Sequence, residues 1–538
     1  CDTEVIVHAW EQWGEACVER FRGMFAFAVW DAGRETLFLA RDRLGIKPLH
    51  YAQLDDGSLI FGSELKALTT HPGLVREIDP YAVEDYFAYG YVPEPRTIYK
   101  QARKLPPGHT LTVRRRQPVP APRAYWDVRF DAAPVDEDEA AEQLIHHLRE
   151  AVDMRMIADV PLGAFLSGGV DSSAVVAMMA GLSGDPVNTC SISFGDPAFN
   201  EATYAQTVAE RYGTRHRVEE ASPDNFSLVD RLAGLYDEPY ADSSAMPTYE
   251  VCRLARRDVT VALSGDGGDE NLAGYRRYRF HRQEERLRNL LPLGLRRPVF
   301  GALAKAYPKA DWAPQMFRAK ATFQAFARDT VEGYFHNISV LNDDQRRALY
   351  SDRFRRELQG YHAAEVLRRH DRNAPTDDPL SRVQYLDLKT YLPGDILTKV
   401  DRASMAHALE VRVPILDHKV VEYMASLPSS LKLRGGEGKY VFKRALEPHL
   451  PEDILYRRKM GFAVPLASWF RGPLRERVRD AVTSPAMLDS GFFDPAFLQR
   501  TVDQHQSGRR DNSATLWSLL MFDAFLRGQT AEGAEAPA

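Results

Sequence analysis

Phe165-Leu-Ser-Gly-Gly-Val-Asp-Ser-Ser173 joins two apolar segments through a turn that contains two glycines. The periodicity on either side predicts a strand over Val160–Leu166 and a helix over Ala174–Leu182. Gly168 and Gly169 let backbone N–H groups turn toward a bound anion, because no Cβ stands in the way. The helix N-terminus adds free N–H donors and a partial positive charge. The stretch therefore predicts a strand–loop–helix site for pyrophosphate.

Asp171 follows the turn, where a Mg²⁺ that bridges phosphates needs an oxygen ligand. The loop is not a Walker A loop, because Gly-x-x-x-x-Gly-Lys-Ser/Thr does not occur in the chain. Gly438-Lys439 is followed by Tyr440 and lacks the upstream glycine. An ordinary glycine-rich turn between a strand and a helix remains the alternative for this stretch.

The composition is typical of a soluble globular protein. With 538 residues, 44% of them hydrophobic, the chain can form more than one core, and we expect two domains. The net charge of −6 gives no general attraction to nucleic acid or to an anionic membrane. No segment approaches ~18 uninterrupted apolar residues. The four cysteines are too few and too scattered for a disulfide framework or a zinc site. We therefore expect a cytoplasmic protein without nucleic-acid or membrane partners.

The hydrophobic period changes along the first part of the chain. Residues 2–21 predict an amphipathic helix. The period then approaches two over three segments, which we predict as strands: Met24–Asp31, Thr36–Ala40 and Leu59–Gly62. The segment Arg114–Arg123 is rich in Arg and Pro and predicts the end of a strand followed by a linker.

Strands and helices alternate after the acidic stretch Asp136–Glu139. The predicted strands are Val187–Phe194, Arg215–Glu219 and Val259–Leu263, and the predicted helices lie near Glu201–Tyr212 and Phe226–Tyr236. This alternation indicates an α/β fold with a doubly wound parallel sheet. From about residue 270 the pattern is mostly helical, and residues 529–538, which are small and polar, predict a disordered tail.

A second glycine-rich loop, Ser264-Gly-Asp-Gly-Gly-Asp-Glu270, follows the strand that ends at Leu263. Ligands of open α/β sheets bind beyond the carboxyl ends of the strands, so the two loops can face each other. One would hold phosphates, and the other would offer carboxylates for Mg²⁺ and for acid–base chemistry. The alternative is a plain acidic or calcium-binding turn, but the loop lacks the twelve-residue frame of an EF-hand.

Together, Ser167–Ser173 and Leu263–Glu270 resemble the glutamine-dependent asparagine synthetase family. The same resemblance is carried by Ser191–Phe194, Asp237–Pro239, Leu392–Asp395, Lys399–Ala406, Leu409–Pro414, Leu416-Asp417 and Gly438-Lys439. Upstream, Phe21–Phe27, Arg41–Pro48 and Phe61–Lys66 resemble the glutaminase domain of that family. The resemblance covers nearly the whole chain. It is especially close to the asparagine-synthetase-like amidotransferases found with bacterial exopolysaccharide and exosortase loci.

The resemblance implies two domains and a reaction. Residues 131–528 would form a doubly wound parallel sheet of the PP-loop ATP pyrophosphatase type with a helical C-terminal part. Residues 1–130 would form a partial N-terminal-nucleophile α+β glutaminase domain. The implied reaction activates a carboxylate with ATP as an acyl-adenylate, which ammonia then attacks. Aspartate is the expected acceptor, glutamine or ammonia the nitrogen source, and ATP and Mg²⁺ the cofactors; a homodimer is left open.

The resemblance also assigns site residues. The adenosine site would be lined by Leu166, Ile192, Ser264 and Gly265, and the pyrophosphate cradle by Ser167, Gly168, Gly169, Ser172 and Ser173. Asp171 and Asp269 would bind Mg²⁺, and Asp266 matches the acidic position tied to adenylate formation and to its attack by ammonia. Lys439 would stabilise charge near the phosphates, with an ordinary surface lysine as the alternative.

Three further charged residues of the matching motifs receive no chemical role. Glu410, Arg412 and Asp417 are expected to form structural ion pairs near the site.

The start of the chain departs from the family pattern. The family nucleophile is an N-terminal Cys followed by Gly, whereas Cys1 leads into Asp2-Thr-Glu-Val-Ile6. That stretch resembles a segment that follows the nucleophile in the family at a distance, and Asp2 then matches the aspartate that binds the amino group of glutamine. We therefore expect Cys1 to occupy an ordinary internal position, in a chain that lacks the first strands of the domain. Glutaminase activity is then expected to be absent, and residues 1–110 to be sensitive to protease.

Two alternatives to asparagine synthesis stay open. The chain can act on another acid in an exopolysaccharide pathway, or it can be a nucleotide-binding relative without catalysis. The presence of every expected residue in the ATP loops argues against loss of catalysis.

Overall fold

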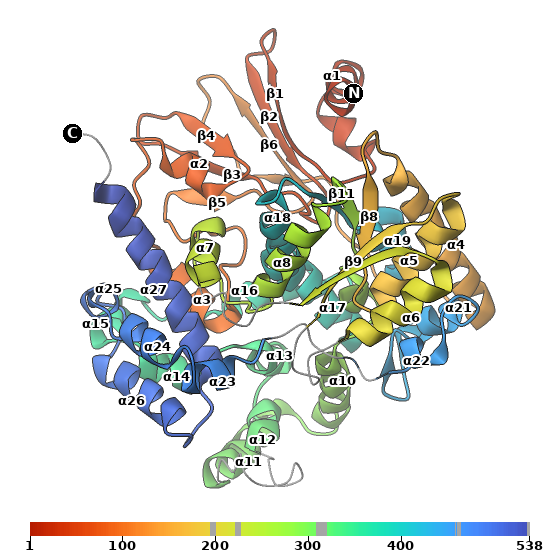
Figure 1. The fold of residues 1–538 in the computed structure, drawn as a ribbon. Helices are drawn as coiled ribbons and strands as arrows, with labels where there is room; N and C mark the ends of the chain where they lie inside the picture. The colour runs from red at the N-terminus through yellow and green to blue at the C-terminus, as the bar shows by residue number, and fades with distance from the viewer. Residues whose placement is uncertain (194–200, 221–226, 308–319, 458, 460–463, 535–538) are drawn as a thin grey trace.

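The computed structural model describes residues 1–193, 201–220, 227–307, 320–457, 459 and 464–534 (Figure 1). Its N-terminal part contains two antiparallel sheets. The first has the order β1 (Ala26–Asp31), β2 (Thr36–Arg41), β6 (His109–Arg114), β7 (Arg123–Ala124), and the second the order β4 (Leu59–Gly62), β3 (His50–Gln53), β5 (Ala102–Lys104). The three strands predicted here are confirmed. The segment predicted as a linker after Arg114 also contributes the short strand β7.

The predicted N-terminal helix is shorter than the sequence pattern suggested. Helix α1 spans Asp2–Trp13, and a 3-10 segment, η1, continues from Gly14 to Glu19. The α-helix ends because Gly14 adopts a φ of +56°, which breaks the α-helical hydrogen bonding at a residue that bears no Cβ. The apolar residues still share one side of this region, since Trp10 and Cys17 are both buried.

A five-stranded parallel sheet forms the centre of the larger part (Figure 1). Its order is β10 (Arg215–Glu220), β9 (Asn188–Ser193), β8 (Leu162–Phe165), β11 (Val261–Leu263), β12 (Glu410–Arg412). The four strands predicted from the sequence are confirmed, and β12 is an addition. Phe194 lies outside the described residues.

Helices cover both faces of this sheet. On β11, Val261 and Leu263 belong to one core and Ala262 to another, as expected when successive side chains of a strand point to opposite faces. The first core includes α4 (Glu137–Met156), α5 (Val170–Leu182) and α6 (Ala202–Tyr212); the second includes α7 (Ser227–Leu235), α8 (Ala245–Ala255) and α18 (Thr398–Met405). The predicted helices near 201–212 and 226–236 are confirmed over their described residues.

The strand order creates a crevice between β8 and β11. From β8 the chain winds outward through β9 to β10, and it then returns to the other side of β8 at β11. Ligands of open α/β sheets bind at such a reversal of strand order. The loops after β8 and β11 are therefore neighbours at the carboxyl ends of adjacent strands.

The chain is mostly helical after residue 270, as predicted. Its elements include α9 (Gly268–Asn271), α10 (Arg276–Arg288), α11 (Leu293–Ala306), α12 (Lys320–Phe326), α13 (Thr330–Ile338), α14 (Asp343–Leu349), α15 (Asp352–Glu357), α16 (Ala364–Asp371), α17 (Pro379–Lys389), η4 (Leu392–Leu397), α19 (His418–Ser426), β13 (Leu433–Arg434), β14 (Glu437–Gly438), α21 (Tyr440–Leu446), α24 (Arg475–Val482), α26 (Pro495–Gln506) and α27 (Ser513–Ala534). The expected disordered tail is wrong over its first part, because α27 continues through Ala534. Residues 535–538 lie outside the described residues. No helix in the described ranges is long and apolar enough to cross a membrane.

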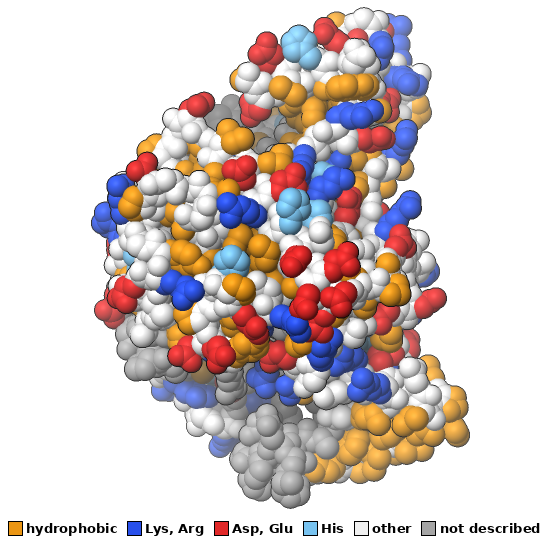
Figure 2. Space-filling model, turned by 90° about the vertical axis from the view of Figure 1, so that its right-hand side faces the viewer, with side chains coloured by type: hydrophobic (Ala, Val, Ile, Leu, Met, Phe, Trp, Pro, Cys, Tyr) orange, Lys and Arg blue, Asp and Glu red, His pale blue; other side chains and the backbone are white. Residues whose placement is uncertain are grey.

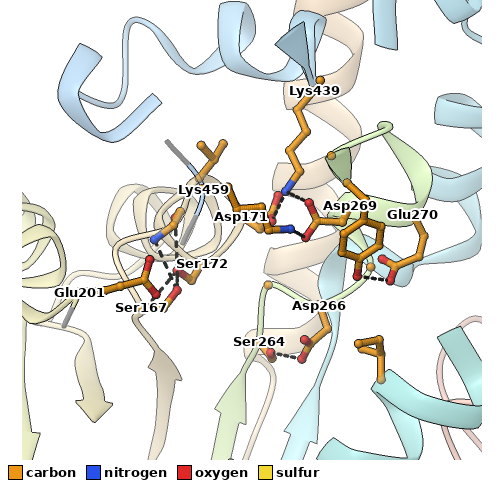
Figure 3. Close-up of a pocket in the computed structure, with 18 of the residues that line it drawn as sticks. Ser167, Asp171, Ser172, Glu201, Ser264, Asp266, Asp269, Glu270, Lys439 and Lys459 are labelled. Atoms are coloured by element: carbon orange, nitrogen blue, oxygen red, sulfur yellow. Dashed lines mark hydrogen bonds and ion pairs between the residues drawn. The ribbon is translucent and has the colours of Figure 1, made fainter. Parts of the chain in front are cut away.

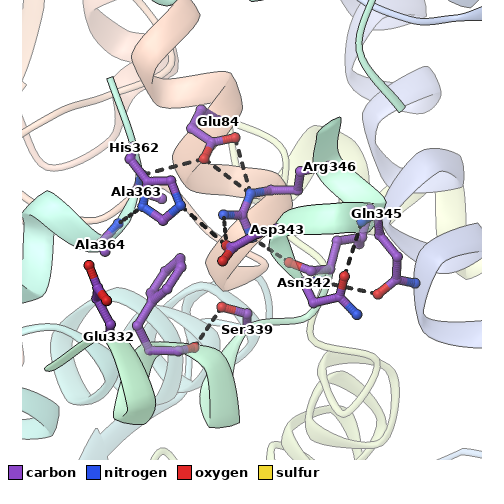
Figure 4. A network of polar contacts seen from close by, with 12 residues as sticks. Glu84, Glu332, Ser339, Asn342, Asp343, Gln345, Arg346, His362, Ala363 and Ala364 are labelled. Atoms are coloured by element: carbon purple, nitrogen blue, oxygen red, sulfur yellow. Dashed lines mark hydrogen bonds and ion pairs between the residues drawn. The ribbon is translucent and has the colours of Figure 1, made fainter. Parts of the chain in front are cut away.

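The N-terminal and C-terminal regions share one core through α3 (Pro80–Tyr89). Tyr86 of α3 donates a hydrogen bond to the carbonyl of Ser518 in α27 at 2.7 Å. On the same helix, Glu84 accepts a hydrogen bond from Arg346 Nε at 3.1 Å (Figure 4). It also accepts one from the Tyr350 hydroxyl at 2.7 Å. Strand β7 ends at Ala124 and α4 begins at Glu137, and the parts on either side share a core around α3. The expected domain boundary near residue 130 stays a prediction.

Candidate active site

A cavity of about 860 Å³ opens at the carboxyl ends of β8, β9 and β11. Most of the predicted site residues line it: Leu166, Ser167, Gly169, Asp171, Ser172, Ile192, Ser264, Gly265, Asp266, Asp269 and Lys439. Segments that are distant in sequence thus meet at one place, as the two-loop prediction requires. Gly168 and Ser173 do not line the cavity, and their predicted part in binding pyrophosphate stays a prediction.

Gly168 shapes the first loop from behind. Its φ is +70°, and a Cβ at this position would lie 2.6 Å from the backbone nitrogen of Ala205 on α6. Its carbonyl accepts a hydrogen bond from Arg457 Nη2 at 3.1 Å. Ser173 is fully buried beneath the loop in the core that includes α5. Both residues therefore lie behind the residues that line the cavity.

The loop leaves the N-terminus of α5 open toward the cavity. Gly169 is the N-cap of this helix and brings no side-chain cap. The Ser172 hydroxyl accepts a hydrogen bond from the Ser167 backbone N–H at 3.2 Å and lies 3.0 Å from the Ser167 hydroxyl. Free N–H groups at a helix N-terminus, together with two hydroxyls, form a site that suits a phosphate group.

The second loop makes direct contact with the first. A Cβ on Gly265 would lie 2.6 Å from the backbone nitrogen of Ser172, so only glycine allows this approach. Within the loop, the Ser264 hydroxyl donates to Asp266 Oδ2 at 2.5 Å (Figure 3). Burial raises the pKa of Asp266, and the hydrogen bond from Ser264 partly opposes that rise.

Two lysines and two aspartates meet where the loops face each other (Figure 3). Lys439 forms an ion pair with Asp171, and its Nζ lies 2.8 Å from Asp269 Oδ1. Lys459 Nζ lies 2.5 Å from Asp269 Oδ2. Lys439 enters the site from the start of α21 in a left-handed conformation with φ +57°. It is only 6% exposed, which rules out the alternative of an ordinary surface lysine.

The cluster is balanced in charge, and this balance sets the protonation of its members. Burial alone would raise the pKa of Asp269, but Lys439 and Lys459 hold it below its usual range. Burial also raises the pKa of Asp171, and the neighbouring charge of Asp269 adds to that rise, against the opposing effect of Lys439. Burial disfavours the charged form of Lys439, but the two carboxylates raise its pKa above the usual value.

The two carboxylates fit a Mg²⁺ that is held mainly by phosphate oxygens. Asp171 Oδ1 is buried and has no hydrogen-bond partner in the structure, so an oxygen ligand is free on the loop. Over the described ranges, no cluster of three or more His, Cys, Asp or Glu side chains could hold a metal on its own. Mg²⁺ is commonly bound by one or two carboxylates plus substrate phosphates, which is the set that Asp171 and Asp269 can offer.

Sequence reasoning gave no role to a second polar cluster that lines the cavity. Lys399 of α18 donates from Nζ to Asp242 Oδ2 at 2.7 Å and to the Ser244 hydroxyl at 2.8 Å, and all three residues line the cavity. Asp395 lies behind them in η4, a π-helical turn, and accepts a hydrogen bond from Tyr240. Burial, together with the charge of Asp242, raises the pKa of Asp395 to about 7.

The resemblance had placed Lys399 and Asp395 in matching stretches without assigning them a function. Lys459 belongs to no such stretch, so no sequence signal pointed to it. Glu201 also lines the cavity, and its carboxylate accepts from Arg457 at 2.5 Å.

The expected structural ion pairs are confirmed outside the cavity. Arg412 donates to Glu410 at 2.6 Å. Asp417 accepts hydrogen bonds from Arg22 Nε and from Arg155 Nη1, both at 2.9 Å. Because Arg22 belongs to the N-terminal part, this fully buried carboxylate helps to join the two parts of the chain.

Asp2 and Cys1 lie apart from the cavity, at the start of α1. The Asp2 carboxylate accepts a hydrogen bond from the Thr3 backbone at 2.8 Å, and both Cys1 and Asp2 are exposed. The Cys1 amino group lies 3.2 Å from Glu4 Oε2. The predicted role of Asp2 in binding glutamine stays a prediction.

Fold and site together define an α/β nucleotide-dependent enzyme attached to an antiparallel N-terminal part. The chain matches the family model described as asparagine synthase over residues 143–527 and the model described as glutamine amidotransferase domain over residues 1–126. The chain therefore belongs to the asparagine synthase family and is a ligase of the glutamine-hydrolysing asparagine synthetase type. This family uses ATP.

Relatives with that name cover almost all of this chain. Asparagine synthetase [glutamine-hydrolyzing] 1 of Bacillus subtilis is 30% identical over 97% of this chain and 80% of its own length. A putative asparagine synthetase [glutamine-hydrolyzing] of Mycobacterium tuberculosis is 36% identical over 97% of this chain and 79% of its own. A more distant relative, named amidase chyE, from Penicillium rubens, is 27% identical over 94% of this chain and 78% of its own.

Proposed function

We propose that the chain catalyses the ATP-dependent amidation of a carboxylic acid through an acyl-adenylate, with aspartate as the acceptor and asparagine as the product. The observation that carries this proposal is the meeting of the two glycine-rich loops in one cavity. Ser167, Ser172 and the N-terminus of α5, which would bind phosphate, line this cavity together with Asp266 and Asp269 of the second loop. ATP and an acid can therefore be held side by side.

The proposed reaction has two steps. An oxygen of the acceptor carboxylate attacks the α-phosphorus of ATP, the bond between the α-phosphorus and the bridging oxygen breaks, and pyrophosphate leaves. Ammonia, supplied by glutamine hydrolysis or from solution, then attacks the acyl carbon. The nitrogen loses a proton, the bond from the acyl carbon to oxygen breaks, and AMP leaves with its electron pair.

The residues of the cavity support distinct parts of this reaction. Ser167, Ser172 and the N-terminus of α5 would bind the leaving pyrophosphate. Lys439 would stabilise the negative charge that grows on that group, because its ammonium is buried and fixed by two carboxylates. Asp266, whose carboxylate is oriented by Ser264, would act at the acyl group and at the attacking nitrogen.

Asp171 and Asp269 would hold a Mg²⁺ together with the phosphates of ATP. When bound, the ion would neutralise charge on the departing pyrophosphate. Lys439 and Lys459 would give up part of their contact with these carboxylates when the ion binds. The phosphates would supply new anionic partners for both lysines. The free Oδ1 of Asp171 supports this assignment.

A different acceptor acid is the second candidate. The relative named amidase chyE shows that a related protein can carry a name other than asparagine synthetase. A cavity of about 860 Å³ also has room for ATP and for an acid larger than aspartate. Lys399 and Asp242 line the same cavity and would contact that acid.

Acid-dependent exchange of radioactive pyrophosphate into ATP tests the proposal, with a panel of acids that includes aspartate, glutamate, larger dicarboxylates and uronic acids. We expect exchange with aspartate and little with acids that lack its second carboxylate. Exchange with another acid alone would establish the second candidate. ATP binding without exchange for any acid would contradict both and would indicate a nucleotide-binding protein without this catalysis.

A further inference from the structure

The polar cluster of Asp242, Ser244 and Lys399 presents a carboxylate and an ammonium side by side in the cavity. Lys399 of α18 contacts both Asp242 and the Ser244 hydroxyl. Ser244, the residue before α8, also donates to Asp242 from its backbone N–H at 2.9 Å and from its hydroxyl at 2.6 Å. The two charged groups are therefore held in fixed positions.

The cluster keeps the capacity to bind a ligand. A lysine ammonium has three donors, and the contacts with Asp242 and Ser244 use two of those of Lys399 among the described residues. The Asp242 side chain is 22% exposed, and both residues line the cavity. A molecule in the cavity can thus reach one donor of the ammonium and the exposed part of the carboxylate.

The carboxyl groups around Lys399 outnumber its single ammonium. Burial lowers the pKa of Lys399, but the charges of Asp242, Asp395 and Asp266 raise it above the usual value. Burial and the charge of Asp242 also keep Asp395 protonated up to a pKa of about 7. Carboxylates that share too little positive charge in a buried place favour one more cation. The cluster is therefore complementary to a ligand that carries both an ammonium and a carboxylate.

We propose that Asp242 and Lys399 recognise the α-amino acid end of the acceptor, with Asp242 binding its ammonium group and Lys399 binding its α-carboxylate. This inference rests on the proposed function, because the acid to be activated must share the cavity with ATP. It makes the acceptor a free α-amino acid with an acidic side chain. An acid without an amino group, or with an acylated one, would leave Asp242 without its cation.

The position of Lys399 relates this recognition to the chemistry. Its charge acts on Asp266 and lowers the pKa of that carboxyl, against the larger effect of burial. An acceptor bound at Lys399 is therefore close to the residue that we assign to the acyl group. With its α-carboxylate paired to Lys399, the side-chain carboxylate of the acceptor is the one left for activation.

A purely structural ion pair explains Asp242 less well. Asp417, which pairs with Arg22 and Arg155 outside the cavity, has a fully buried side chain. Asp242 instead lines the cavity and is partly exposed there. A carboxylate that serves only the fold needs no such access.

Long-range attraction offers little discrimination among small acids. On the face shown in Figure 2, acidic and basic side chains lie interspersed. A surface of mixed sign does not favour one small anion over another. Selection among acids therefore depends on groups inside the cavity, where Asp242 and Lys399 lie.

Isothermal titration calorimetry on the full chain tests the proposal, in the presence of Mg²⁺ and an ATP analogue with a methylene bridge between its α- and β-phosphorus atoms. The ligands are aspartate, succinate, which lacks the amino group, and 3-aminopropanoate, which lacks the α-carboxylate. We expect each loss to weaken binding by roughly tenfold or more, because a charged group of the cavity is left without its partner. N-acetylaspartate should bind as weakly as succinate.

Two variants assign the two contacts. Asp242→Asn should weaken the binding of aspartate and 3-aminopropanoate and leave that of succinate unchanged. Lys399→Met should weaken the binding of aspartate and succinate and leave that of 3-aminopropanoate unchanged. Asp185→Asn is the matched control, because Asp185 is exposed and does not line the cavity. The thermal midpoint shows whether each variant is folded, and the comparison of acids on the wild-type chain needs no variant.

Equal affinities of the wild-type chain for aspartate, succinate and 3-aminopropanoate would overturn the proposal. So would an Asp242→Asn variant that loses succinate as strongly as aspartate. A higher KM for ammonium with an unchanged affinity for aspartate in this variant would also overturn it, because Asp242 would then bind the free ammonium ion.

Pyrophosphate exchange on the same samples separates this inference from the proposed function. The expected binding pattern without exchange would support the recognition site and contradict the adenylate reaction. Exchange together with equal affinities for the three acids would support the reaction and overturn the recognition site.

Discussion

Lys439 Nζ lies 2.8 Å from Asp269 Oδ1 and joins this carboxylate to Asp171 on the other glycine-rich loop. The lysine comes from the start of α21, and the aspartates come from the first turns of α5 and α9. A single ammonium group therefore joins three separate segments. We expect Lys439→Met to lower acid-dependent pyrophosphate exchange by roughly 100-fold, the loss seen when a preorganised charge-stabilising donor is removed. Lys419→Met, on an exposed lysine, is the control and should exchange at the wild-type rate.

The two loop aspartates should behave differently from Asp266. Asp171→Asn or Asp269→Asn should lower pyrophosphate exchange by ~10–100-fold, by analogy with other changes around metal sites. The loss should shrink when the Mg²⁺ concentration is raised. Asp266→Asn should keep the affinity for ATP and lose exchange, because its proposed role lies at the acyl group. ATP titration and exchange on the same three variants separate the two effects, and an unchanged exchange rate in Asp171→Asn would remove the phosphate-site assignment.

Close contact between the loops should make Gly265 intolerant of a side chain. A Cβ there would lie 2.6 Å from the Ser172 nitrogen, so Gly265→Ala must push the loops apart. We expect ATP affinity to fall by at least tenfold while the chain remains folded. Gly184→Ala is the matched control, because nothing lies within 4 Å of its added Cβ. Equal ATP affinities for the two variants would show that the loops do not form the nucleotide site.

Asp395 should make the chain less stable as the pH rises. Burial and the neighbouring Asp242 raise its pKa to about 7 in the folded chain, against 3.8 for the unperturbed group. Between these values the folded state holds a proton that the unfolded state has lost, so stability falls from pH 4 to pH 7. The full effect is at most roughly 4 kcal/mol. Urea unfolding of Asp395→Asn should show a smaller loss of stability over this range than the wild type. An identical pH dependence of the unfolding free energy in the two proteins would contradict the assignment.

Asp417 should matter for stability and not for chemistry. Its buried carboxylate pairs with Arg22 and Arg155, and Asp417→Asn would leave two guanidinium groups without their shared partner. Removing one member of a buried ion cluster costs roughly 3–5 kcal/mol. The denaturation midpoint should therefore drop, while exchange activity per folded molecule stays at the wild-type value. A selective loss of activity with normal stability would mean that this carboxylate contributes to the reaction.

The sequence was most informative where structure is local. Each glycine-rich loop could be recognised because its strand, turn and helix are contiguous, and the acidic residues that follow share the same segment. The lengths of α1 and α27 were misjudged for local reasons as well. Gly14 ends a helix that the apolar periodicity predicts through residue 21, and the small polar residues after Gln529 continue a helix that begins at Ser513.

Contacts between distant segments could not be derived in this way. Lys459 reaches Asp269 across 190 residues of sequence, and no motif links the two. Lys399 and Asp242 meet because α18 packs on α8, a helix that the sequence pattern did not predict. The inward-facing positions of Gly168 and Ser173 likewise depend on how α5 and α6 pack beneath the loop.

Isotope transfer from the acceptor acid tests the central claim most directly. The chain is incubated with ATP, Mg²⁺, ammonium and aspartate labelled with ¹⁸O in its side-chain carboxylate, and the products are analysed by mass spectrometry. An acyl-adenylate route leaves one carboxylate oxygen on phosphorus, so one ¹⁸O should appear in AMP and none in pyrophosphate. Label in inorganic phosphate together with ADP, or unlabelled AMP, would contradict the account.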